Sequence, residues 1–152
     1  MDLTGDELAG VVDLFGGLTR ADLERAVEEL AFKRGEGFDA ESLETAVVAA
    51  REHYQLVEVD TDGEAVLVAG PVAFPTLPDG ATDLPHILDA PERHIDRETA
   101  GEAAQERLRR EALAAAKAED SDRAAVLLDV CYDLEAWAPV DTDEFRARLD
   151  DV

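Results

Sequence analysis

Three histidines and one cysteine are the side chains of this chain that could carry metal-assisted or nucleophilic chemistry. His53, His86 and His94 form none of the H-x-x-x-H, H-E-x-x-H or H-x-H patterns that aim two ring nitrogens at one ion. His86 and His94 flank a proline-rich stretch near Asp83 and Asp89, so a small metal-assisted hydrolase would assemble its site there. The alternative, which we favour, is that these two histidines lie in surface loops and that His53 ends a helix.

Cys131 could attack a substrate only as a thiolate, which needs a neighbouring base that lowers its pKa. It lies one helical turn from Leu127 and Leu134, so a small buried apolar residue is the favoured interpretation. Acidic pairs such as Asp120 and Asp122 are too frequent here to indicate a general acid and base. Glycine-rich phosphate loops, G-x-S-x-G and C-x-x-C are absent from the sequence. We therefore predict no catalytic residue, no metal ligand and no cofactor, and a protein that is not an enzyme.

Residues 1–70 predict helices followed by a β-hairpin. Thr4 begins a capping box, and Thr19 and Asp39 can cap a second and a third helix. Asp62-Gly63 separates two strand-like runs at 55–60 and 65–69, which indicates a hairpin because both turn positions need positive φ. This order of elements is that of a winged-helix domain. The apolar stripes of the helices recur at helical spacing and consist of Leu8, Val11, Val12 and Phe15, then Leu23, Ala26, Val27, Leu30 and Ala31, then Leu43, Val47, Ala50 and Tyr54.

Residues 71–95, which we call the strap, are rich in proline and exclude a long helix or strand. The strap is also too apolar for a free linker, so we expect it to lie in an ordered form across the core. Its segment 74–78 could dock on this chain or on a partner, and the candidate partner-binding residues are Phe74, Pro75, Leu77 and Pro78. The alternative is that the strap only fills the gap between two lobes.

Residues 96–152 predict a helical lobe. Asp96 can cap a helix that runs to about Glu119, Ser121 or Asp122 can cap another through Ala138, and a short helix follows at 143–149. The middle helix is the most apolar and should form the buried centre of this lobe. The predicted fold class is therefore α+β and mainly α: a winged-helix-like lobe, the strap, and a helical lobe packed on the first as one compact unit.

The charge of the chain is strongly negative, with 37 acidic against 14 basic residues and a net charge of -23. Both parts of the chain share it: residues 1–72 carry 17 acids and 5 bases, and residues 73–152 carry 20 and 9. Nucleic-acid affinity rests on Lys and Arg that meet phosphate, so this charge makes nucleic acid an unexpected partner. A winged-helix DNA-binding regulator stays the alternative, with Arg20, Arg25 and Arg51 as its candidate contacts.

Such an acid excess is typical of proteins that work at high salt. In about 1 M salt the Debye length falls to roughly 3 Å, so surface carboxylates scarcely repel one another. A G+C-rich genome is the alternative source of this composition. With no signal peptide, no apolar run that could span a bilayer and a single cysteine, we expect a cytoplasmic protein without a membrane partner.

Three stretches resemble a small family of haloarchaeal proteins of unknown function: LAGVVDLFGGLTR at 8–20, GPVAFPTLP at 70–78 and LDVCYDLEAWAPVD at 128–141. The resemblance covers essentially the whole chain. It implies a halophilic cytoplasmic setting, and it brings no activity, ligand or catalytic residue with it. We expect a non-enzymatic protein-interaction or regulatory adaptor that binds a protein partner or itself.

Overall fold

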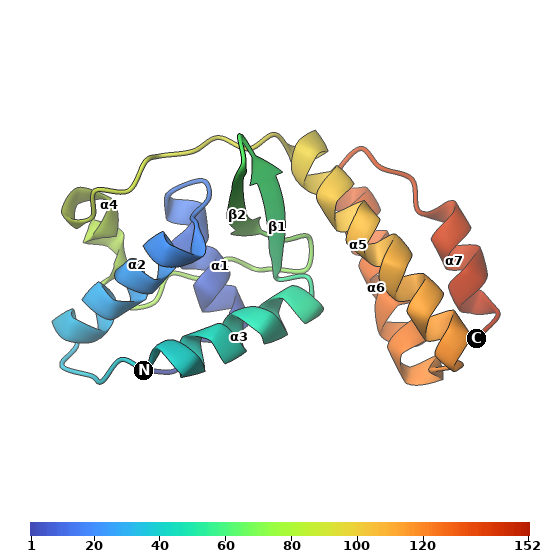
Figure 1. The fold of residues 1–152 in the computed structure, drawn as a ribbon, viewed down its shortest axis with the longest axis horizontal. Coiled ribbons are helices and arrows are strands. Elements are labelled where there is room, and N and C mark those ends of the chain that lie inside the picture. The colour runs from blue at the N-terminus through green and yellow to red at the C-terminus, as the bar shows by residue number, and fades with distance from the viewer. The chain divides into compact units, whose positions relative to one another are not determined.

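The computed structural model describes residues 1–152 and contains two compact units, Met1–Ile95 and Asp96–Val152. Its elements are drawn along the chain in Figure 1. Helices dominate, and the only sheet is a two-stranded antiparallel hairpin. The predicted fold class, α+β and mainly α with helices before a hairpin and a helical C-terminal part, is confirmed.

Unit 1 begins with the helices α1 (Gly5–Leu14), α2 (Arg20–Lys33) and α3 (Ala40–Glu52). The residues predicted to cap them do so. Thr4 forms a capping box with Glu7, the Thr19 hydroxyl accepts from the Asp22 N–H over 3.2 Å, and the Asp39 carboxylate accepts from the Glu41 N–H over 3.3 Å. Each cap satisfies a backbone donor that has no partner inside its helix.

The hairpin consists of β1 (Leu56–Thr61) and β2 (Glu64–Ala69), with Val57 opposite Val68 and Val59 opposite Val66. Asp62 and Gly63 both adopt positive φ, 51° and 82°. The turn therefore has the backbone that the Asp-Gly pair predicts.

The core of unit 1 lies between the helices and the hairpin. Leu18, in the loop between α1 and α2, bridges to Leu67 of β2 through two backbone hydrogen bonds of 3.0 and 2.7 Å. Most of the predicted stripe residues are fully buried, and Leu43 is half-buried. The fully buried large side chains of this unit include Leu8, Phe15, Leu18, Leu23, Leu30, Tyr54, Leu56, Leu67 and Leu84.

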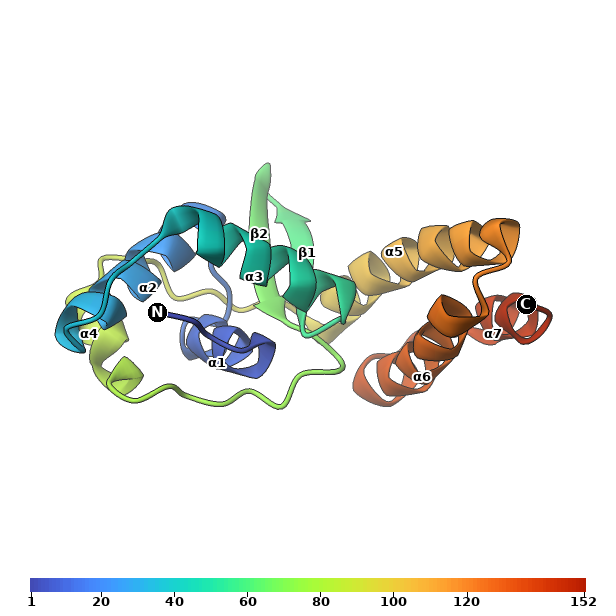
Figure 2. The same cartoon turned by 90° about the horizontal axis from the view of Figure 1, so that it is seen from below.

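The strap contains only a short 3₁₀ turn (Ala81–Asp83) and the single-turn helix α4 (Leu84–Ile87). Figure 2 shows it passing α1 on its way from β2 to α4. Ala81 and Leu84 are buried in the core of unit 1. At its far end the Arg93 N–H donates to the Phe15 carbonyl over 2.8 Å. The strap is thus an ordered part of unit 1.

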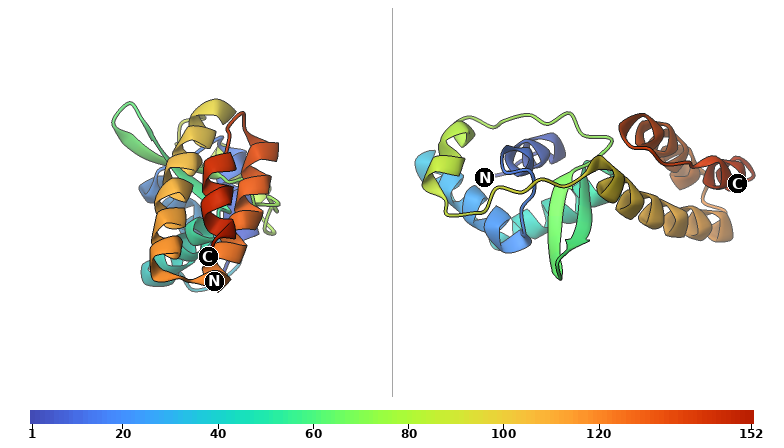
Figure 3. Two further views of the ribbon diagram at one scale, coloured as in Figure 1. Left: turned by 90° about the vertical axis from the view of Figure 1, so that its right-hand side faces the viewer. Right: turned by 90° about the horizontal axis from the view of Figure 1, so that it is seen from above.

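Unit 2 consists of α5 (Arg97–Ala118), α6 (Ser121–Trp137) and α7 (Asp143–Asp150), which lie side by side in Figure 3. Leu127, Cys131 and Leu134 of α6 are buried at its centre, as predicted. The predicted cap of α6 at Ser121 or Asp122 is wrong, because the Asp120 carboxylate accepts from the Arg123 N–H over 3.1 Å. Glu119 takes a left-handed conformation that ends α5 and leaves Asp120 as the residue before the next helix.

Candidate interaction surface

The strap segment 74–78 is fastened by its backbone to the first turn of α1. The Phe74 N–H donates to the Asp6 carboxylate over 3.1 Å, and the Thr76 N–H donates to the Asp6 carbonyl over 3.0 Å. The Gln55 amide donates to the same carboxylate oxygen over 3.2 Å. A Cβ at Gly10 would collide with the Thr76 carbonyl, so the strap can approach α1 only because a glycine stands there. These contacts hold the segment in one backbone conformation.

The apolar side chains of this segment point mostly into solvent. Phe74 is 80% exposed and Leu77 is 46% exposed. Pro75 is also exposed, whereas Pro78 is buried. Of the predicted partner-binding residues, Phe74, Pro75 and Leu77 are therefore accessible to a partner, whereas Pro78 is packed inside unit 1.

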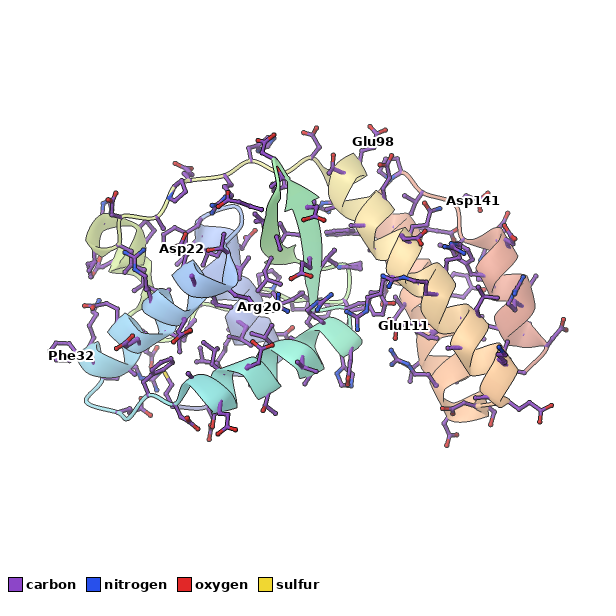
Figure 4. All side chains as sticks on the ribbon, in the orientation of Figure 1. Arg20, Asp22, Phe32, Glu98, Glu111 and Asp141 are labelled. Carbon is purple, nitrogen blue, oxygen red and sulfur yellow. The ribbon has the colours of Figure 1, made fainter.

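Phe32, in the last turn of α2, is an equally exposed aromatic residue that the sequence analysis did not single out. It is 81% exposed and projects from the end of α2 in Figure 4. A hollow of about 300 Å³ beside it is lined by Arg25, Glu28, Glu29, Phe32 and Leu88. The sequence does contain a signal for this exposure, because Phe32 lies outside the apolar stripe that α2 buries.

The predicted nucleic-acid contacts all lie beside carboxylates. Arg20 forms an ion pair with Glu58 of β1 and a longer one, 3.6 Å, with Glu44 of α3. Arg51 reaches the other oxygen of Glu58 over 3.5 Å, so the structure brings Arg20 and Arg51 together. Arg25 instead forms an ion pair with Asp22 of its own helix, over 3.0 Å. Each of these guanidinium groups has a protein carboxylate as its ionic partner.

His53 ends a helix and His94 lies in an exposed irregular segment, as the favoured interpretation predicts, but His86 lies in a single-turn helix and not in a loop. His53 is the C-cap of α3, with its ring Nδ1 2.7 Å from the Ala49 carbonyl oxygen. His86 lies in α4, and His94 lies in the irregular segment before α5. Neither belongs to the one group of side chains with metal-ligand spacing, which lies in unit 2.

That group consists of Glu135, Asp141 and Asp143, whose carboxylate oxygens lie within 4.8 Å of one another. Arg146 forms ion pairs with Glu135, over 3.5 Å, and with Asp143. The Thr142 N–H donates to Glu135 over 2.9 Å, and the Asp143 N–H donates to Asp141 over 2.9 Å. A guanidinium and two backbone donors thus balance these carboxylates, and the cluster anchors the start of α7. The cluster was not predicted from the sequence, although the run Asp141-Thr142-Asp143 before a helix is a signal that could have indicated it.

Cys131 is fully buried. Burial raises the pKa of its thiol, an effect that the Thr142 hydroxyl only partly offsets. The thiol is therefore protonated at neutral pH and has the packing role that its helical stripe predicts.

None of the helices combines the length and apolar character needed to cross a lipid bilayer. Among known protein families, residues 6–152 match the one described as "Family of unknown function (DUF7109)". Neither curated proteins nor solved structures gave a match to this chain. The family match extends over both units.

Proposed function

The chain belongs to DUF7109, a family of unknown function, and from its structure we propose that it is a non-enzymatic interaction module. Its strap segment 74–78 binds a protein partner through Phe74, Pro75 and Leu77. The observation that carries this proposal is an aromatic side chain, 80% exposed, on a backbone that Asp6 holds in place.

An exposed Phe74 is well suited to binding on energetic grounds. Moving a phenylalanine side chain from water to an apolar surface contributes about 1.5–3 kcal/mol, and aromatic residues are frequent among those that dominate interface energies. Because the hydrogen bonds to Asp6 already order the backbone, binding loses little conformational entropy in this segment. The buried Pro78 next to Leu77 limits that entropy further.

The ionic contacts of the arginines favour a protein over a nucleic acid as the partner. Phosphate would have to displace Glu58 from Arg20 and Arg51, and Asp22 from Arg25. The chain as a whole carries a net charge of -23, which repels a polyanion. A winged-helix DNA-binding regulator stays the alternative because the order of elements in unit 1 fits it.

The setting that we propose is a cytoplasm rich in salt. Attraction between charges that are not in direct contact weakens there because charges are screened within a few ångströms. Contacts made by Phe74, Pro75 and Leu77 do not depend on charge, so they keep their strength under those conditions.

The test is affinity purification from native lysate at high salt, with wild-type protein and a double variant, Phe74→Ser with Leu77→Ser. The matched control is Phe32→Ser, which removes an equally exposed phenylalanine from another element. We expect mass spectrometry to find a protein that wild type and the control retain and the double variant loses.

Recovery of the same proteins with all three baits would contradict the proposal. Co-purified DNA that depends on Arg20 and Arg51 would favour the DNA-binding alternative instead. Sedimentation of the purified protein distinguishes a foreign partner from self-association, because a dimer that the double variant abolishes would identify the partner as a second copy.

A further inference from the structure

Unit 1 contains a groove of about 530 Å³ that shares no residue with segment 74–78. It lies between residues 1–3, the loop before α3 and the face of α3 that extends to Ala49. Its volume falls in the range of about 300–1,000 Å³ that is usual for binding pockets. We call it the α3 groove, and it is lined by Met1, Asp2, Leu3, Val27, Phe38, Asp39, Glu41, Ser42, Leu43, Thr45, Ala46 and Ala49.

The apolar lining of the α3 groove is continuous with the core of unit 1. Val27 is buried, and Leu3, Phe38, Leu43 and Ala46 are half-buried against the core. The Met1 nitrogen donates to the Gly37 carbonyl over 2.8 Å and fastens residues 1–3 beside the loop. The groove is therefore formed before a ligand binds, with an apolar surface that an apolar group could cover.

The charged side chains of the α3 groove are Asp2, Asp39 and Glu41, and the only cation in its lining is the N-terminal ammonium of Met1, which donates to the Gly37 carbonyl. The hydrogen bond from the Ser42 hydroxyl, over 2.7 Å, lowers the pKa of Asp39 below its ordinary value, and backbone N–H groups and the N-terminal ammonium act in the same direction. The lack of a basic side chain distinguishes this groove from other hollows on the same protein. Three smaller hollows of this acidic protein each include arginine, namely Arg25, Arg123, and Arg109 with Arg148.

We propose that the α3 groove binds a cationic amphipathic segment of a partner protein. Apolar side chains of that segment would cover Leu3, Phe38 and Ala46, and its lysines or arginines would face Asp2, Asp39 and Glu41. A second copy of this chain is the less suitable occupant, because its acidic residues outnumber its basic ones by 37 to 14 and would place carboxylates directly against the acidic rim. Fatty acids and nucleic acids are unsuitable for the same reason, because both are negatively charged and would face the acidic rim.

The test uses a fluorescent amphipathic peptide composed of leucine and lysine, and its counterpart with glutamate in place of lysine. Fluorescence anisotropy is measured in about 1 M KCl, where the Debye length of roughly 3 Å suppresses general attraction to an acidic surface. The blocking variant is Ala49→Arg, which places a cation on an exposed position of the groove. Its control is Ala125→Arg, the same change of charge at an exposed alanine of α6.

We expect the lysine peptide to bind wild type at least about tenfold more tightly than the glutamate peptide. Ala49→Arg should weaken binding about tenfold, and Ala125→Arg about twofold or less. Shifts of amide NMR signals on adding the lysine peptide should concentrate at Leu3, Phe38 and Ala46.

Equal weakening by the two variants, or NMR shifts spread over both units, would overturn the proposal in favour of general attraction. A dimer that Ala49→Arg alone dissociates would overturn it in favour of a second copy. A negative result for the α3 groove would not contradict the proposal for segment 74–78. The two tests are independent, since Phe74→Ser with Leu77→Ser alters no residue of the α3 groove.

Discussion

Asp39 combines two tasks in one side chain: it caps α3 and forms part of the rim of the α3 groove. The Ser42 hydroxyl is the main cause of its lowered pKa, since a hydrogen bond to the charged form of a carboxyl group favours ionisation. The cap therefore adds to stability above the ordinary pKa of an aspartate. That contribution is lost as the pH falls through the lowered pKa of the folded state.

Ser42→Ala should raise the pKa of Asp39 toward its ordinary value. The change can be followed in the NMR titration of the Asp39 carboxyl carbon. Thr45→Ala is the control, because its hydroxyl donates to the Glu41 carbonyl and not to Asp39. An unchanged pKa of Asp39 in the Ser42 variant would show that the backbone donors and the N-terminal ammonium account for the lowering without the Ser42 hydroxyl.

At the scale of elements, α7 is held to α6 through polar contacts as well as apolar ones. Glu135 of α6 accepts from the Thr142 N–H and forms an ion pair with Arg146 of α7. Phe145 and Leu149 supply the apolar contact, and both are buried. Because Thr142 is fully buried, water cannot easily replace a lost acceptor for its N–H.

Glu135→Ala should lower the free energy of unfolding by about 1–3 kcal/mol, the usual cost of leaving a buried donor without its acceptor. Urea unfolding measures that loss, and hydrogen exchange at the Thr142 amide should accelerate. Asp133→Ala removes an exposed carboxylate from the same helix and should change stability far less. Similar losses in the two variants would mean that charge, and not the contact to Thr142, accounts for the effect.

On the scale of the whole molecule, the acid excess is present in both units, so each must fold against its own repulsion. The ion pairs of Arg20, Arg51 and Arg93 in unit 1 and of Arg123 and Arg146 in unit 2 offset only part of it. Screening by salt can reduce the rest.

The unfolding midpoint should therefore rise steeply between low and multi-molar KCl, followed by circular dichroism during thermal or urea unfolding. Replacing the exposed Glu24, Glu28 and Glu102 by Gln should make that rise smaller, because fewer charges remain to be screened. A midpoint that does not change with KCl would contradict the halophilic interpretation.

Short-range sequence signals were sufficient to predict most helix starts and the hairpin turn of this protein. Thr4, Thr19 and Asp39 cap their helices as predicted, and Asp62-Gly63 forms the hairpin turn, because capping and turn formation depend on neighbours within a few residues. The cap of α6 was misplaced by one residue or more, since several residues near 120 could cap and only the end of α5 selected Asp120.

The sequence by itself determined the fold class, the acid excess and the exposed-or-buried pattern of most helices, because helical spacing and charge are properties of the chain. Only the tertiary structure decided that Asp6 holds Phe74 outward, that Arg20 and Arg51 meet at Glu58, and that an acidic rim surrounds an apolar groove beside α3. These features join residues far apart in the chain. Periodicity carries no information about which distant side chains a fold brings within a few ångströms of one another.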